Sequence, residues 1–222
     1  MGHVILVTGG QRGIGACIAQ QSRAMHWDVL APSREVCDVL DVDSVTRYVS
    51  WLHQSVPTLH AVVLNAHAWC SKPCADLRLT DFETQWRYVT SHWLLLRALL
   101  AHYALECVVA VSSVRGLIGG VESAPYAMAK AALIALMQGY AREYTARPTR
   151  FHVVCPGWTD TTMGLEVKRT GGVSNPDAVA QDPNVVAQHV CHLLRAPVSG
   201  YVVRINQGIA TRMAWQEQPD DL

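Results

Sequence analysis

Residues 4 to 15 read Val4-Ile5-Leu6-Val7-Thr8-Gly9-Gly10-Gln11-Arg12-Gly13-Ile14-Gly15, and this stretch decides how the chain begins to fold. Its four apolar residues predict a short strand that is buried on both faces of a parallel sheet. The glycine turn lets the backbone approach an anion closely, and a helix predicted over about 13–24 offers free N–H groups to that anion. This order is typical of a dinucleotide-binding unit, whereas a glycine turn alone is often only a tight loop.

The length suggests one globular domain, or at most two, over residues 1–222. Half of the residues are hydrophobic and 16% are charged, so the chain can bury a sizeable core. The 18 basic and 18 acidic side chains balance, which leaves no basic field for nucleic acid or an anionic membrane surface. The first residues lack a signal-peptide pattern, and the chain has no stretch of about 18 apolar residues that would span a membrane. We expect a cytoplasmic protein without nucleic-acid or membrane partners.

Seven cysteines are scattered along the chain, mostly within apolar runs, as is typical of buried free thiols in a cytosolic protein. The spacing His67-x-x-Cys70-x-x-x-Cys74 contains metal-binding residue types, but structural zinc sites use closed four-ligand sets with tighter spacing. We therefore expect no metal site.

Strands and helices are predicted to alternate along the chain. After the first strand, strands are expected at 26–31, 36–39, 59–64, 107–111, 151–155 and 201–205. Later helices are expected at 45–55 (capped by Asp43 or Ser44), 80–103 (capped by Thr80 or Asp81), 125–147 and 183–194. The second and third strands are too close for a crossover helix, so the sheet is expected to be abbreviated there. This order predicts an α/β fold with a doubly wound, mostly parallel sheet.

Two further segments have no predicted regular structure. Residues 158–182 are polar and contain glycine without a strong period, and a long connection of this kind is usually functional. The tail over about 212–222 is expected to be loosely ordered from Gln216.

Polar and small residues recur where the predicted strands end. They are found at Thr8–Gly15, Asn65, Ser112–Ser113 and Pro156–Gly157. Because ligands of open α/β sheets bind along the carboxyl edge of the strands, we expect the functional site there.

The motifs at these strand ends resemble those of the short-chain dehydrogenase/reductase family over nearly the whole chain. Thr8–Gly15 matches the family pattern TGxxxGxG, and Tyr126–Lys130 matches YxxxK. Ser113 precedes Tyr126 by thirteen residues, which is the usual family spacing of the catalytic serine. Weaker matches are Asn65-Ala66-His67 to NAG, Pro156–Thr161 to PGxxxT and Asn206-Gln207-Gly208 to the terminal DGG. The resemblance implies a single Rossmann-like NAD(P)-binding domain, layered α/β/α, with oxidoreductase activity on carbonyl and alcohol groups.

Tyr126 and Lys130 are four residues apart and therefore share one helix face. An adjacent ammonium favours the phenolate and is expected to lower the tyrosine pKa from about 10, which makes the two residues a candidate acid/base pair. The alternative is an exposed tyrosine and an exposed lysine on a surface helix. The resemblance implies that Ser113 binds the substrate carbonyl, Tyr126 donates the proton and Lys130 also binds the nicotinamide ribose. Ser112 is expected to point the other way and to cap the backbone.

Two departures from the family pattern bear on the chemistry. The family usually places an Asn of a proton relay on the long helix, but residues 80–103 contain none, and Tyr88, Thr90, Ser91 and His92 occupy that neighbourhood. His67 stands where the family has a glycine near the cofactor. It is expected either to crowd the cofactor, to hydrogen-bond a ligand, or to be a surface loop residue.

The residues after the second strand favour NADP(H) over NAD(H). An NAD enzyme usually carries an Asp or Glu there for the ribose 2′-OH, whereas this chain has Ser33-Arg34. A guanidinium pairs well with phosphate, and Arg12 is a second basic residue that resembles NADP-preferring members. The alternative is that both arginines are solvated surface residues. The cofactor site that the resemblance implies consists of Gly9, Gln11, Arg12, Gly13, Ile14, Gly15, Ser33, Arg34, Asp38, Val39, Asn65, Ala66, Tyr126, Lys130, Pro156, Gly157, Thr159 and Thr161.

The substrate is expected to be a small carbonyl or alcohol compound in a mostly apolar pocket. The expected contacts are Ser113, Arg115, Trp158 and Met163, with Trp69 at the far side and the loop 158–182 as a lid. Arg115 is open to two interpretations, a contact to an anionic group or a solvated side chain. The alternatives to an active enzyme are a catalytically silent NADP-binding sensor or scaffold and a non-redox relative. The resemblance also implies a homodimer or homotetramer that pairs the helices near 81–103 and 125–147.

Overall fold

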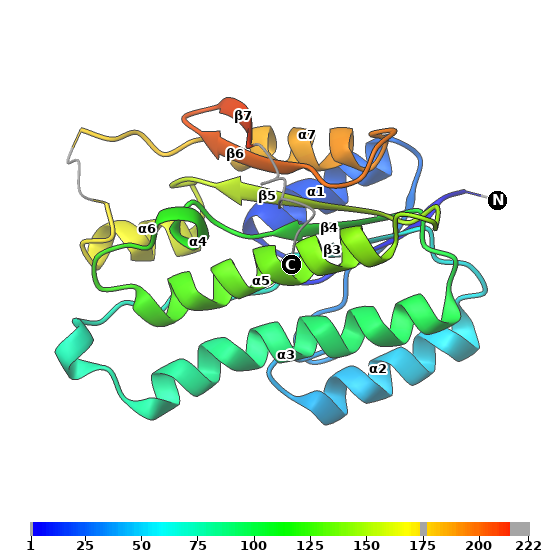
Figure 1. Cartoon of the computed structure of the whole chain (residues 1–222), viewed down its shortest axis with the longest axis horizontal. Helices are drawn as coiled ribbons and strands as arrows, with labels where there is room; N and C mark the ends of the chain where they lie inside the picture. The colour runs from blue at the N-terminus through cyan, green and yellow to red at the C-terminus, as the bar shows by residue number, and fades with distance from the viewer. Residues whose placement is uncertain (1, 174–176, 214–222) are drawn as a thin grey trace, which may run out of the picture.

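The computed structural model describes residues 2–173 and 177–213, which form one seven-stranded sheet with helices on both faces (Figure 1). The strands are β1 (Val4–Val7), β2 (Asp28–Leu30), β3 (Ala61–Leu64), β4 (Cys107–Val111), β5 (Arg150–Pro156), β6 (Val202–Asn206) and β7 (Ile209–Met213). They lie in the order β2-β1-β3-β4-β5-β6-β7, and every pair is parallel except β6 with β7. The connections run to opposite sides from β1, so a crevice is expected outside the carboxyl ends of β1 and β3.

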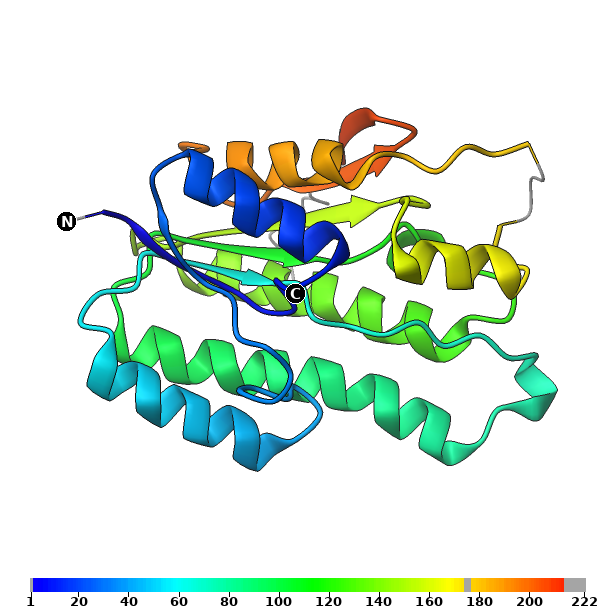
Figure 2. The same cartoon turned by 180° about the vertical axis from the view of Figure 1, so that it is seen from behind.

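Helices cover the two faces unequally. α1 (Gly13–Ala24) and α7 (Pro183–Leu193) pack together on one face, and α2 (Val42–Ser55), α3 (Leu79–His102) and α5 (Ala124–Glu143) cover the other (Figures 1 and 2). Successive residues of a strand point to opposite faces of the sheet, so each face has its own hydrophobic core. In β1, Leu6 packs towards α2 and α3, whereas Ile5 and Val7 pack towards α1 and α7. Burial on both faces explains why the strands are continuous apolar runs. The predicted three-layer, Rossmann-like architecture is confirmed.

The third strand predicted over 36–39 is wrong. After β2 the chain turns, because the N–H groups of Val36 and Cys37 both donate to Ser33 O, at 3.1 and 2.9 Å. The Asp38 N–H then donates to Ser44 Oγ at 3.0 Å, and α2 starts at once. Its cap is Asp41, whose carboxylate accepts the Asp43 N–H at 3.0 Å, and not Asp43 or Ser44. The segment between β2 and α2 is too short to hold a crossover helix and a further parallel strand. β2 is therefore at the edge of the described sheet.

The connection over 158–182 is more ordered than its sequence indicates. It contains α6 (Thr162–Arg169), a helix begun by Thr161, whose hydroxyl accepts the Gly164 N–H at 3.0 Å. Residues 174–176 of this connection lie outside the described ranges. Two short helices were also missed, η1 (Cys74–Asp76), a 3-10 helix, and α4 (Arg115–Ile118).

The C-terminal segment departs from the prediction as well. β7 runs to Met213, where the tail was expected to begin at about 212. Gln207 and Gly208 have φ angles of 50° and 76°, the backbone of a tight hairpin turn between β6 and β7. The tail from Gln216 lies outside the described residues.

Helix ends differ by a few residues. α3 begins at Leu79 after Arg78, whose N–H donates to the Asp81 carboxylate at 2.9 Å, and α5 ends at Glu143 rather than near 147. Within the described ranges, no helix has both the length and the hydropathy needed to cross a membrane.

Candidate active site

The glycine turn lies between the end of β1 and the start of α1, as the sequence predicts. Gly9 and Gly13 have φ angles of 64° and 54°, a backbone region that side chains rarely adopt. A Cβ at Gly15 would lie 2.3 Å from Gly9 O and 2.5 Å from the Asn65 amide nitrogen. Arg12 precedes α1 and makes no side-chain cap, so the first N–H groups of the helix face the turn without a capping side chain. The turn therefore has the features of an anion cradle.

Thr8 and Asn65 hold this turn against the end of β3. The Thr8 hydroxyl accepts the N–H groups of Asn65 and Ala66, at 2.9 and 3.1 Å. In return, the Asn65 amide donates to Thr8 O at 3.0 Å and Gly9 O at 3.2 Å. Thr161 approaches from the far side, 3.3 Å from a Cβ placed on Gly13. Asn65, Ala66 and Thr161 thus surround the turn, as expected of cofactor-site residues.

Ser113, Tyr126 and Lys130 meet where β4 ends. All three side chains are buried, with Tyr126 7% and Lys130 2% exposed, so the interpretation of an exposed surface pair is wrong. The Lys130 ammonium donates to Val111 O at 2.9 Å and lies 5.7 Å from the centre of the Tyr126 ring. Ser113 hydrogen-bonds the Tyr126 hydroxyl, and its Oγ also accepts the Arg115 N–H at 3.1 Å.

The electrostatics of this group differ from the sequence expectation. Burial raises the pKa of Tyr126 to about 12, although Ser113 and the Arg115 cation act in the opposite direction. Burial also lowers the pKa of Lys130 to about 7, since the ammonium loses its hydration. The prediction that Lys130 would bring the tyrosine pKa down is therefore wrong for the protein alone, because desolvation outweighs the neighbouring charge.

Ser112 has the structural role that was expected of it. Its hydroxyl donates to Lys130 O at 2.8 Å and so joins the end of β4 to α5. Cys155 on β5 lies close to Ser112 and Lys130, and burial raises its pKa to about 12. Its thiol is thus neutral, and all seven cysteines are free.

His67 points away from the glycine turn and into a row of aromatic rings. Its Nε2 lies 2.9 Å from Gln85 Oε1, and its ring centre lies 4.3 Å from Tyr88 and 5.3 Å from Tyr126. The nearest neighbours of Cβ positions on Gly9 and Gly15 belong to Asn65, Ala66 and the turn itself. His67 is therefore not among the nearest neighbours of the turn, and its ring packs at intermediate exposure against Tyr88 and Tyr126 rather than standing free in a surface loop. A contact of His67 with a bound ligand stays a prediction.

His92, on α3, lies near Lys130 of α5. It is 1% exposed, and its Nε2 has no hydrogen-bond partner among the described residues. Burial and the Lys130 charge lower its pKa to about 3, and the same causes lower that of His67 well below its ordinary value. Gln85, Tyr88 and His92 share one buried face of α3. Their spacing of three and four residues is the signal in the sequence that could have grouped them.

The segment after β2 carries the predicted adenosine contacts. The Arg34 Nε donates to the Asp38 carboxylate at 2.9 Å, and the Arg34 side chain is 76% exposed. Burial raises the pKa of Tyr88, and the charges of Arg34 and Arg12 act in the opposite direction, so both arginines lie within electrostatic range of this ring. Gln11 donates to Ala31 O, which ties the turn to the end of β2. The Asp38 carboxylate accepts hydrogen bonds from the Arg34 side chain and from the Leu40 N–H. Val39 is buried.

The residues after β5 line the opposite side. A Cβ on Gly157 would meet Asn206 Oδ1 at 2.5 Å, and the Thr159 hydroxyl donates to Gly157 O at 3.0 Å. The predicted substrate contact Trp158 donates to Gly164 O at 2.9 Å, with the Lys168 ammonium 5.5 Å from its ring centre. Met163 lies partly exposed in the first turn of α6.

Arg115 is held by backbone carbonyls rather than left in solvent. Its guanidinium donates to Gly172 O and, at 3.4 Å, to Gly119 O. The solvated interpretation is therefore replaced by a contact to the segment that follows α6, and the contact of Arg115 to an anionic substrate group stays a prediction.

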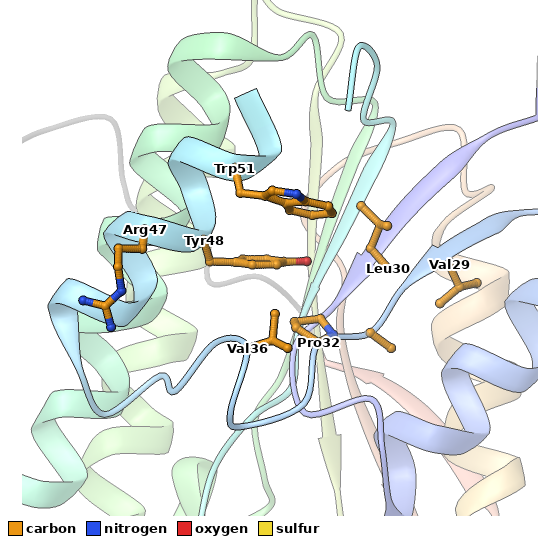
Figure 3. Close-up of a pocket in the computed structure, with 8 residues that line it drawn as sticks. Val29, Leu30, Pro32, Val36, Arg47, Tyr48 and Trp51 are labelled. Carbon is orange, nitrogen blue, oxygen red and sulfur yellow. The ribbon is translucent and has the colours of Figure 1, made fainter. Parts of the chain in front are cut away.

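A separate groove of about 410 Å³ runs along β2, where the third strand was expected (Figure 3). Figure 3 shows the Trp51 and Tyr48 rings of α2 lying one above the other and facing Leu30 and Pro32. This groove is away from Tyr126 and Lys130.

Comparison with known proteins identifies relatives over most of the chain. The model of the short chain dehydrogenase family matches residues 3–171. Carbonyl reductase family member 4 of Xenopus tropicalis is 32% identical over 96% of this chain and 100% of that protein. The 3-oxoacyl-[acyl-carrier-protein] reductase MabA of Mycobacterium avium is 30% identical over 72% of this chain and 68% of that protein.

Solved structures share the fold at lower identity. ElxO with NADP bound superposes with a TM-score of 0.80 at 22% identity, covering 94% of this chain and 98% of that one. A short chain dehydrogenase from Burkholderia cenocepacia in complex with NADP gives 0.79 at 24% identity, with the same coverage.

Proposed function

The chain belongs to the short chain dehydrogenase family, and we propose that it is an NADP-dependent oxidoreductase that interconverts a ketone or aldehyde and an alcohol, with Tyr126 as the acid and base. The oxidoreductase class follows from the family. The observation that carries the finer assignment is the buried contact of Ser113, Tyr126 and Lys130 at the carboxyl edge of the sheet.

The residues at the turn fit a dinucleotide. A Cβ at Gly15 would lie 2.3 Å from Gly9 O, and Gly9 has a φ of 64°, so glycine at both positions keeps the backbone of the turn free of side chains of its own beside the helix N-terminus. Arg12 and Arg34 supply cations on the side where a 2′-phosphate would lie, and the NADP-bound neighbours support the same cofactor. When bound, the cofactor would exchange a hydride with the carbonyl carbon.

The protonation states suit reduction. The Tyr126 phenol, with a pKa of about 12, is protonated at neutral pH and can donate its proton to the carbonyl oxygen as charge develops there. Ser113 is positioned to hydrogen-bond the same oxygen, and the Arg115 N–H fixes its hydroxyl. When Lys130 is protonated, its ammonium lies 5.7 Å from the centre of the Tyr126 ring and would favour the phenolate that remains after proton transfer.

Replacing Tyr126 by Phe tests the assignment, because it removes only the hydroxyl. We expect NADPH-dependent reduction of a panel of small ketones and aldehydes to fall by roughly 100-fold or more, with the NADPH dissociation constant changed less than threefold. Tyr140→Phe, on the same helix but packed against Phe151, is the matched control and should keep its activity. NADPH binding without oxidation, equal in wild type and Tyr126→Phe, would instead favour the silent sensor or scaffold. The homodimer or homotetramer stays a prediction.

A further inference from the structure

Trp69 covers the ring of the catalytic tyrosine. It lies in the loop between β3 and η1, and its ring centre is 4.8 Å from that of Tyr126 at an interplanar angle of 63°. The His67 ring centre also lies 5.3 Å from that of Tyr126, so two aromatic rings contact the phenol ring. A substrate bound at the Tyr126 hydroxyl would therefore lie near the indole.

The indole is anchored to the end of α6. Its Nε1 donates to Thr170 Oγ1 at 3.0 Å, and the Thr170 hydroxyl donates in turn to Glu166 O at 2.9 Å on α6. A Cβ on Gly172 would lie 3.0 Å from Trp69 Cζ2, so this glycine lets the backbone rest against the ring. Because its polar edge is satisfied, the indole can offer a ligand only its apolar surface.

Arg115 anchors the same segment from the opposite side. Its guanidinium donates to Gly172 O and Gly119 O, and a Cβ on Gly120 would fall 2.1 Å from its Nη1. The glycines of this loop therefore make room for the guanidinium. The Arg115 guanidinium is thus engaged with backbone carbonyls, and the Lys130 ammonium donates to Val111 O, which leaves the Trp69 ring as an apolar surface that a ligand can contact.

We propose that Trp69 is the specificity-determining residue of this site and that it selects carbonyl compounds that carry a flat unsaturated ring next to the carbonyl carbon. The flat ring lies against the indole while the carbonyl oxygen reaches Tyr126 and Ser113. This inference rests on the proposed function and adds the substrate class to it. Aromatic contacts gain free energy beyond their buried area, which corresponds to roughly 2- to 10-fold in affinity.

Two ketones of equal carbon count provide the test, acetophenone and cyclohexyl methyl ketone, which differ in the flatness of the ring. The quantity measured is the ratio of their kcat/KM values, and of their dissociation constants from the NADPH-loaded protein by calorimetry. Comparing this ratio between variants cancels the different intrinsic reactivity of the two ketones. Trp69→Ala should lower it roughly 2- to 10-fold, mainly through KM, and Trp69→Phe should keep most of it. Thr170→Val should lower it less, because the ring remains but loses its anchor.

Trp51→Ala is the control, since Trp51 is 46% exposed on α2 and lines the distant groove. It should leave the ratio unchanged, and NADPH binding and the melting temperature establish that each variant folds. An unchanged ratio in folded Trp69→Ala overturns the inference while turnover leaves the proposed function intact. Binding of both ketones without turnover contradicts the proposed function, and the ratio of dissociation constants still decides the role of Trp69. Binding of neither ketone overturns the substrate class.

Discussion

Lys130 should make the folded protein less stable at neutral pH than it would be without this charge. The side chain is 2% exposed, and no carboxylate pairs with it among the described ion pairs. Its neighbours are the neutral imidazoles of His67 and His92, the Cys155 thiol and the Tyr126 phenol. We therefore expect Lys130→Met, which keeps the length of the side chain and removes the amine, to raise the free energy of unfolding at pH 6.

The magnitude follows from the difference in pKa between the folded and unfolded states. The folded pKa of about 7 lies below the ordinary value of about 10.4, so the unfolded chain binds the proton more tightly. At pH 6 and below this costs the folded state about 5 kcal/mol, at 1.36 kcal/mol per pKa unit. The variant also leaves Val111 O without its donor, which costs about 1–3 kcal/mol. The net gain at pH 6 is therefore about 3 kcal/mol.

The sign of the effect should reverse as the pH rises. Between about pH 7 and 10 the folded lysine is neutral while the unfolded one is charged, so the wild type gains about 1.4 kcal/mol per pH unit and the variant does not. Above about pH 10 the desolvation cost is gone, and the variant should be the less stable protein because of the bond to Val111 O.

Urea unfolding at pH 6, 7, 8 and 9 without cofactor measures the difference in free energy of unfolding between wild type and Lys130→Met. The contributions of the other titrating groups are the same in both proteins and cancel in this difference. Lys168→Met is the control, because Lys168 is exposed on α6 and should change stability by less than about 0.5 kcal/mol at every pH. A difference between wild type and Lys130→Met that stays constant from pH 6 to 9 would refute the reasoning.

Two further substitutions test the cofactor site. Arg34→Ala should raise the NADPH dissociation constant by roughly 10- to 100-fold and hardly change that of NADH, since a charge-assisted bond to phosphate is lost; an equal loss for both cofactors would contradict NADP preference. Gly15→Ala should abolish NADPH binding in calorimetry, because its Cβ would lie 2.3 Å from Gly9 O. Gly139→Ala, at an exposed position of α5 with nothing within 4 Å of the added Cβ, should bind NADPH normally and gain up to about 1 kcal/mol in stability.

Local pattern predicted the parts of the site that depend on neighbours in sequence. The apolar run, the glycine turn and the helix from Gly13 follow one another directly, and the structure has them in place. Tyr126 and Lys130 are joined by helical spacing, so their common face was also predictable. The position of Ser113 came from family spacing, and its contact with Tyr126 agrees with it.

The errors arose where long-range packing decides. Val36–Val39 has the residues of a strand, but the turn at Ser33 and the nearby start of α2 leave no segment to carry it to the sheet edge. The bond from Trp69 to Thr170 joins residues 101 positions apart, and nothing local in either segment indicates it. The pKa of Tyr126 depends in the same way on burial that spacing alone does not reveal.

The buried groups together show which of them can respond to pH near neutrality. His67 and His92 are neutral there because burial lowers the pKa of each, to about 3 for His92. Tyr126 and Cys155 keep their protons, since burial raises the pKa of each to about 12. Lys130 alone among these five titrates near pH 7. A change of activity with pH close to neutrality should therefore report the charge of Lys130, and the two histidines in the site contribute polarity and shape rather than a proton.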